Sequence, residues 1–297
     1  MVNRLSARLG VALLMLLATM FAGNHIAARL AFDHGASVNA AVAVRSGATA
    51  LALVALLRLL SVPLALPRAT LARGLGIGLL VALQSFCLYS AVARIPVALA
   101  LLAFNTYPML FALASWAVNG ERPSKRAAFA MPLALVGLVL ALDVVGSARH
   151  VAGRWAEIGA GVGFAIAGSL LFAAVLVFTT RYLKEVDGRV RSLLTMGATA
   201  IAVLAVGAAT NSLALPADGL GWLGLALLTL LYGSAITAVF TIVPRLGAAS
   251  NAAALNFEPV AALILGWAIL GQTVSPLQIF GALVVVGAIT LLGSAKK

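Results

Sequence analysis

The stretch Leu99–Glu121, LALLAFNTYPMLFALASWAVNGE, returns in diverged form at Ser250–Gln272 as SNAAALNFEPVAALILGWAILGQ. A shift of about 151 positions brings the shared residues into register. The aligned pairs are Asn105 with Asn256, Pro108 with Pro259, Trp116 with Trp267, Gly120 with Gly271, and Ser124 with Ser275. Further back, Val44-Arg45-Ser46 aligns with Val190-Arg191-Ser192. The chain therefore contains an internal repeat over most of each half, and two such halves predict a site between them.

Composition assigns the chain to the membrane. Of its 297 residues, 63% are hydrophobic and only 9% are charged, and the mean hydropathy is +1.11. A soluble domain could not cover so much apolar surface. The apolar runs are about 20 residues long, which as helix crosses a hydrocarbon core of about 30 Å. The short alternating segments of a membrane β-barrel are not visible. The sequence thus predicts an all-α integral membrane protein, and the single Cys87 excludes an intrachain disulfide.

Ten apolar spans, five in each half, are bounded by charges, glycines, prolines or polar clusters. They are predicted at 9–31, 38–60, 74–93, 97–118, 126–145, 158–180, 190–210, 220–243, 248–270 and 277–294. The predicted organisation is a first five-helix repeat over 1–146, an extracytoplasmic connection over 147–157 and a second five-helix repeat over 158–297. Arg4 and Arg8 precede the first span, as in a secretory signal. We interpret it as a span because the repeat requires one to pair with the sixth.

The distribution of basic residues predicts the orientation. Fifteen of the twenty Lys and Arg residues fall on the side that holds both termini, and one, Arg45, lies within the second span. The opposite side holds Arg29, Arg94, Arg149 and Arg154. This bias predicts cytoplasmic N- and C-termini, in a bacterial inner membrane. The net charge of +12 is then a topological signal beside anionic lipid, and no nucleic-acid partner is expected.

An odd number of spans in each half makes the repeats inverted. The second half must enter the membrane from the opposite side, which is a transporter architecture with its site near the bilayer midplane. Pro108 and Pro259 lie about midway along their spans, where each removes a backbone donor and crowds the carbonyl four residues earlier. One interpretation is a pair of hinges or exposed carbonyls at a cavity, and the other is a pair of fixed packing kinks. The symmetry of the pair favours hinges.

These residues also carry a family resemblance. The segments ARIPVALALLAFNTYPMLFALASWAVNGERPSKRAAFAMPLALVGLVLAL and PRLGAASNAAALNFEPVAALILGWAILGQTVSPLQIFGALVVVGAITLLG resemble EamA-type members of the drug/metabolite transporter superfamily. Gln272 stands where the first copy has the acidic Glu121, and Phe21-Ala22-Gly23-Asn24 departs from the family's Trp-Gly element. The resemblance implies ten helices with cytoplasmic ends and a cavity lined by spans 1, 3, 4, 6, 8 and 9. It also implies export or exchange of small metabolites, often amino acids, by alternating access without ATP.

Enzymatic function and cofactors are not expected. The three histidines, His25, His34 and His150, show neither metal-ligand spacing nor a Ser/His/Asp arrangement, so no metal site is predicted. No Gly-rich loop ending in Gly-Lys-Ser/Thr is present. The scattered glycines suit close helix packing in lipid.

Polar residues at membrane depth are the candidate site. Glu258 is the only carboxylate near the centre of a span, where a charge costs roughly 2.5 to 3.5 kcal/mol. It could bind a proton, receive a substrate ammonium, pair with Arg45 or His25, or be a structural carboxyl. Arg45 lies about seven residues into its span and is expected to extend to the outer surface. The candidate substrate-binding residues are Asn24, His25, Gln84, Tyr89, Asn105, Tyr107, Ser169, Tyr232, Thr237, Asn251 and Asn256.

These observations predict a secondary transporter of small neutral or zwitterionic metabolites. Because intramembrane charge is sparse, a polyanionic substrate is not expected. Amino acids with aromatic or large neutral side chains fit best, since aromatic residues accompany the amides and hydroxyls. The alternatives are export of other drug-like metabolites and a non-transporting membrane subunit. The expected partners are the small-molecule substrate and membrane lipid. A monomer would suffice because ten spans enclose a site, and an oligomer is equally compatible.

Overall fold

The protein is described by a computed structural model over residues 7–120, 125–141, 155–241, 257–272 and 274–293. Every regular element in these ranges is a helix. The helices are α1 (Ala7–Asp33), α2 (Val38–Leu59), α3 (Arg68–Arg94), α4 (Val97–Phe104), α5 (Tyr107–Asn119), α6 (Lys125–Ala141), α8 (Trp155–Tyr182), α9 (Gly188–Ala209), α10 (Gly219–Thr241), α11 (Glu258–Leu270) and α12 (Pro276–Gly293). The all-α prediction is confirmed.

Each of the ten predicted spans contains a helix. Seven helical stretches of the described chain are long and apolar enough to cross a membrane, and α6, α11 and α12 contain shorter apolar stretches. The fourth span is divided into α4 and α5. The ninth predicted span begins outside the described residues, and its described part is α11. The prediction of two five-helix repeats therefore holds at the level of the elements.

The repeat in sequence is also a repeat in structure. Helices α5 and α11 are both 13 residues long, and each has its proline in the first turn, where a backbone N–H is not needed. Each ends at a glycine in the left-handed conformation, Gly120 with φ 74° and Gly271 with φ 62°. Glycine adopts this conformation without the steric cost of a side chain. The residues that match between the halves therefore mark the start and the stop of the same helix.

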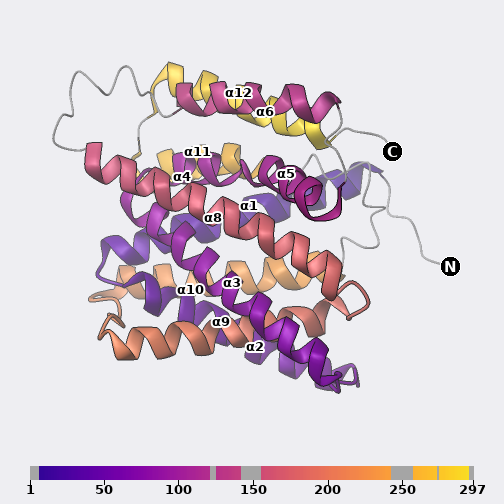
Figure 1. Ribbon diagram of the computed structural model, residues 1–297. Helices are drawn as coiled ribbons and strands as arrows, with labels where there is room; N and C mark the ends of the chain where they lie inside the picture. The colour runs from indigo at the N-terminus through magenta and orange to yellow at the C-terminus, as the bar shows by residue number, and fades with distance from the viewer. Residues whose placement is uncertain (1–6, 121–124, 142–154, 242–256, 273, 294–297) are drawn as a thin grey trace.

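Contacts between the halves show the inverted two-fold relation. Helix α1 packs on α10, α3 on α8, α2 on α9, and α6 on α12 (Figure 1). Exchanging the repeats converts the first pair into the second and leaves the other two pairs unchanged. Figure 1 shows α6 and α12 along one edge of the bundle and α2 and α9 along the opposite edge. The remaining helices lie between them and enclose the centre.

Small residues allow these helices to approach closely. A β-carbon added to Gly224 of α10 would lie 2.8 Å from the Ala27 oxygen and the Ala31 nitrogen of α1. One added to Gly281 of α12 would lie 2.6 Å from the Gly137 oxygen of α6. Backbone contact of this kind is a way to associate helices in lipid, where the hydrophobic effect between them is weak.

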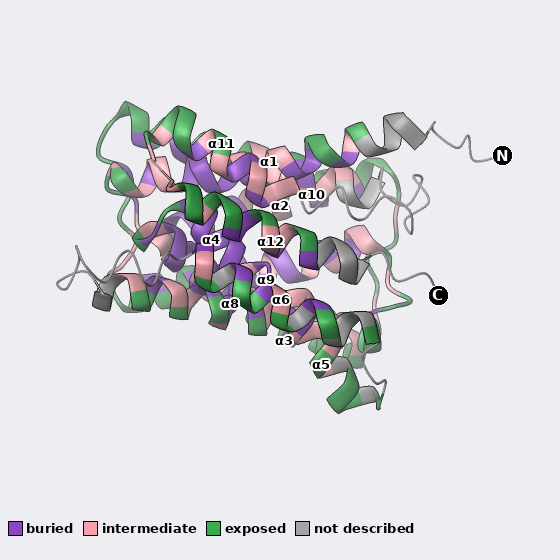
Figure 2. Cartoon of the chain, turned by 90° about the horizontal axis from the view of Figure 1, so that it is seen from above, coloured by how far each residue is buried: buried purple, intermediate pink, exposed green. Residues whose placement is uncertain are grey.

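The outside of the bundle is apolar. Leu51, Leu59 and Ile201 are 73%, 83% and 71% exposed, and buried residues concentrate toward the interior (Figure 2). Both repeat-related tryptophans, Trp116 and Trp267, are also exposed. An apolar exterior around a bundle of spanning helices is what a lipid environment requires.

Candidate functional site

A cavity of about 250 Å³ lies among α1, α2, α3, α8, α10, α11 and the α4–α5 break. Both repeats therefore supply its walls. The predicted site residues that line it are Asn24, His25, Gln84, Tyr89, Asn105, Tyr107, Tyr232 and Glu258. Polar groups from distant parts of the chain thus gather in one interior space.

Other predicted residues lie elsewhere. Ser169 is buried on α8, where its hydroxyl and that of Thr106 lie 2.9 Å apart and join α8 to the α4–α5 break. Thr237 lines a separate, more open depression between α2 and α10. Asn251 and Asn256 lie outside the described residues. Pro108 and Pro259 lie in the first turns of α5 and α11 and do not line the cavity.

The break between α4 and α5 has its own hydrogen bonds. The Asn105 side chain donates to the Leu101 carbonyl at 2.8 Å, and the Thr106 hydroxyl donates to the Ala103 carbonyl at 2.8 Å. These side chains supply donors where the regular helical pattern stops. The interruption precedes Pro108, so the proline begins a new helix instead of bending a continuous one.

A chain of buried hydrogen bonds joins α1, α2 and α3 at the cavity wall. The Tyr89 hydroxyl donates to Asn24 Oδ1 at 2.5 Å, and Asn24 Nδ2 donates to the Phe21 carbonyl at 2.5 Å. Arg45 donates from Nη1 to the Tyr89 hydroxyl at 3.0 Å and from Nη2 to Ser85 Oγ at 3.1 Å. The guanidinium also lies over the Tyr232 ring of α10, 3.9 Å from its centroid.

The expectation that Arg45 reaches the outer surface is wrong. Arg45 is only 3% exposed and lines the cavity. Two hydroxyls from α3 and an aromatic face from α10 hold the cation inside, because each gives it an electron-rich contact that lipid cannot give. The expectation that few charged side chains lie within the membrane is also corrected. The buried guanidinium of Arg45 places a cation inside the protein.

Glu258 and His25 form the second polar group of the cavity. His25 Nε2 lies 3.6 Å from Glu258 Oε1, and the His25 ring packs against Tyr89 with 5.3 Å between ring centroids. Glu258 begins α11, where the helix dipole favours a negative charge. Of the two candidate partners of Glu258, Arg45 and His25, the structure places His25 beside it.

Three aromatic residues form a wall of the same cavity. Phe104, Tyr107 and Phe172 contact one another, with centroid distances of 4.8 to 5.6 Å. Phe172 and Ser85 were not among the predicted site residues. The sequence could have predicted Phe172, because it follows the candidate Ser169 by three positions on one helix and therefore shares its face.

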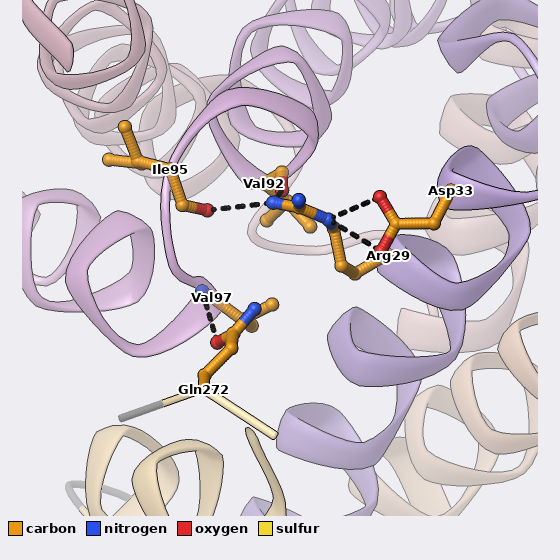
Figure 3. A network of polar contacts seen from close by, with 6 residues as sticks. All are labelled: Arg29, Asp33, Val92, Ile95, Val97 and Gln272. Carbon is orange, nitrogen blue, oxygen red and sulfur yellow. Dashed lines mark hydrogen bonds and ion pairs between the residues drawn. The ribbon is translucent and has the colours of Figure 1, made fainter. Parts of the chain in front are cut away.

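One end of the bundle is joined by polar contacts (Figure 3). Arg29 Nε donates to both Asp33 oxygens at 2.8 and 3.0 Å, and Nη1 donates to the carbonyls of Val92 and Ile95 at 3.3 and 3.4 Å. The Val97 N–H, at the start of α4, donates to Gln272 Oε1 at 3.2 Å. Gln272 belongs to the second repeat and Val97 to the first, so this bond connects the halves.

Further bonds join the halves at the same end, where α1 finishes. Ser37 donates to the Ser212 carbonyl at 2.7 Å, and Asn39 donates to the Ser212 hydroxyl at 2.6 Å. His34 Nδ1 lies 2.7 Å from Asp218 Oδ2. This end of the bundle is therefore joined by bonds between the repeats.

Comparison with known proteins agrees with the repeated architecture. The model of the EamA-like transporter family matches residues 8–142 and again residues 159–294. The chain belongs to the EamA-like transporter family. Each of the two matches of this EamA-like protein covers one repeat. The resemblance inferred from the sequence is thereby confirmed, and the helices of spanning length make the chain a multi-pass membrane protein of this family.

Two relatives accompany the family match. An uncharacterized transporter of Synechocystis sp. is 25% identical to this EamA-like protein over 233 residues, which span 75% of the chain and 66% of the relative. A solved crystal structure covers 98% of each chain with a TM-score of 0.60 at 20% identity. The second likeness is one of fold.

Proposed function

We propose that this EamA-like transporter exports or exchanges small neutral or zwitterionic metabolites, above all amino acids with aromatic or large neutral side chains. The observation that carries the proposal is the division of the cavity into a polar part and an aromatic wall. Arg45 and the Glu258–His25 pair form the polar part, and Phe104, Tyr107 and Phe172 form the wall. A molecule with a polar head and an apolar side chain matches both.

The size of the cavity supports a small cargo. Its volume of about 250 Å³ is below the roughly 300 to 1,000 Å³ of sites that hold drug-sized ligands. One amino acid is an appropriate occupant, whereas a larger drug-like molecule would require the walls to move apart.

We further propose alternating access. The end at which Gln272 bonds to Val97 and Ser37 bonds to Ser212 lies on the side predicted to be extracytoplasmic, and we propose that these bonds hold that side closed. Opening would then break bonds between the repeats, and Pro108 and Pro259, in the first turns of α5 and α11, are the proposed bending points. Inner-membrane location and cytoplasmic termini complete the proposal.

Counterflow in proteoliposomes tests this function. Vesicles loaded with unlabelled phenylalanine should accumulate tracer phenylalanine, with competition by aromatic and large neutral amino acids. Liposomes without protein are the control. Absence of saturable flux across a broad panel of amino acids and other neutral metabolites would refute the transport proposal. Flux restricted to other metabolites would change only the cargo.

A further inference from the structure

Arg45 is a cation without an anionic partner in the described part of the chain. The ion pairs found there join His25 to Glu258, Arg29 to Asp33, His34 to Asp218 and Arg189 to Asp187. Arg45 has neutral hydroxyls as its hydrogen-bond acceptors, and its Nε–H is buried without an acceptor among the described residues. A buried charge with an unused donor is costly unless something completes it.

The aromatic contacts reduce this cost without removing the demand for an anion. The guanidinium lies 3.9 Å from the Tyr232 centroid and 5.0 Å from the Tyr89 centroid. Cation–π contacts stabilise the positive charge, but they leave the N–H donors in the guanidinium plane available. The planar guanidinium suits the two oxygens of a carboxylate.

We propose that Arg45 is the binding site for the carboxylate of the transported substrate. This inference rests on the proposed transport function and names the group that the cavity recognises. A single carboxylate matches Arg45, the one guanidinium among the described residues that line the cavity. The carboxylate of Glu258 in the same cavity opposes a polyanion and, beside His25, gives a substrate ammonium an acceptor.

Within the described residues, the second repeat does not duplicate this group. Arg191, which aligns with Arg45, lies in the first turn of α9 and is not part of the cavity lining. Among the described residues, Arg45 is therefore the one guanidinium that can receive the carboxylate, which fixes the orientation of the bound substrate.

Binding to the purified full-length protein, measured by isothermal titration calorimetry, tests the proposal. Each of several amino acids is compared with its own amide, and phenylalanine is compared with phenethylamine and with 3-phenylpropionate. Wild type should bind each acid at least about tenfold more tightly than its amide, because charge-assisted bonds to Arg45 are lost in the amide. Binding of 3-phenylpropionate as well would extend the substrate class to monocarboxylates.

The variants separate recognition from structure. Arg45→Gln should bind acid and amide equally, whereas Arg45→Lys should keep a weaker preference for the acid. Arg94→Gln is the matched control, since Arg94 also lies on an aromatic ring, Phe164, but is exposed and does not line the cavity. If Arg45→Gln does not fold, the preference for acid over amide is compared between wild type and Arg45→Lys. That comparison still decides whether Arg45 binds the carboxylate.

The outcomes for Arg45 and for transport are distinct. The role of Arg45 is overturned if wild type binds each acid no more tightly than its amide. It is also overturned if Arg45→Gln keeps the full preference for the acid. Both conclusions hold even if counterflow of neutral solutes proceeds. Acid-selective binding that disappears in Arg45→Gln supports that role even if counterflow fails, in which case only the transport proposal falls.

Discussion

At the scale of single residues, Glu258 is the carboxylate through which pH could act on the cavity. It lies beside His25 at the start of α11, and its side chain is 23% exposed. We expect Glu258→Gln to abolish any dependence of counterflow on pH, because the amide cannot exchange a proton. Counterflow at several pH values measures this. Glu185→Gln, in the exposed connection after α8, is the control. A pH profile that survives in Glu258→Gln would make Glu258 a structural residue.

Asp187, outside the membrane-spanning segments, makes a separate prediction about stability. Hydrogen bonds from the Arg189 side chain hold the pKa of Asp187 at about 2, below its usual 3.8. Its contribution is therefore complete above pH 3.8 and is lost as the pH falls toward 2. Asp187 is exposed and Arg189 is half-buried at the surface, so the effect is at most about 1 kcal/mol. The Tm of wild type should exceed that of Asp187→Asn above pH 4 and converge with it toward pH 2. A constant difference would contradict the linkage.

Arg45 marks the limit of prediction at this scale. Its position near the end of a predicted span favoured an extended side chain that reaches the surface. The residues that hold it inside, Tyr89, Ser85 and Tyr232, come from two other helices. Sequence periodicity describes one helix at a time, so it could not show that these acceptors converge on one cation.

At the scale of elements, Gln272 links the end of α11 to the beginning of α4. Gln272→Leu removes this acceptor and should favour opening, by up to about tenfold for a bond worth 0.5 to 1.5 kcal/mol. Ile236→Cys, in the cavity lining, reports opening through its labelling rate with a membrane-impermeant thiol reagent from the extracytoplasmic side, in a Cys87→Ala background. Faster labelling is expected.

The control for this bond is Gln278→Leu. Gln278 accepts a hydrogen bond from the Ser275 N–H within its own repeat. Gln278→Leu therefore removes a side-chain amide but leaves the bond between Gln272 and Val97 in place. Equal labelling rates in Gln272→Leu and Gln278→Leu would show that the link does not hold the end closed.

The α6–α12 pair depends on glycine at its crossing. Gly281→Leu should separate these helices, since its β-carbon alone would overlap the Ala141 backbone, at a cost of about 1 to 3 kcal/mol or more. Gly287→Leu on the same helix is the control, because a β-carbon there meets nothing within 4 Å. Thermal unfolding in detergent should show a lower Tm for Gly281→Leu alone. Equal Tm values for Gly281→Leu and Gly287→Leu would mean that α6 and α12 can move apart without loss of stability.

The elements themselves were largely predictable because each carries local signals. Apolar length marks the spans, and the glycines at positions 120 and 271 mark two helix ends. The separation of α4 from α5 was only half predicted: the proline signalled a disturbance, but the interruption occurs at Asn105 and Thr106. Their side-chain bonds to Leu101 and Ala103 depend on the folded turn and have no distinct pattern in the sequence.

At the scale of the whole molecule, the charge bias predicts which end faces the cytoplasm. Leu215→Cys, between α9 and α10, should react with an impermeant thiol reagent in intact cells. Leu64→Cys, between α2 and α3, should react only after permeabilisation. Both leucines are exposed, at 54% and 43%, so accessibility within the protein is comparable. The reverse pattern would invert the topology.

The paired packing of α1 with α10 and of α3 with α8 has a consequence for the resting protein. If the halves were perfectly equivalent, the proposed inward-facing and outward-facing conformations would have equal free energies. The empty protein would then occupy the two conformations equally. The halves differ at two places that bear on the cavity and its surroundings. Arg45 lines the cavity whereas Arg191 lies in the first turn of α9, and Gln272 stands where the first repeat has Glu121. Under the proposed alternating access, this departure from symmetry would give the empty protein a preferred side of the membrane to which its cavity opens.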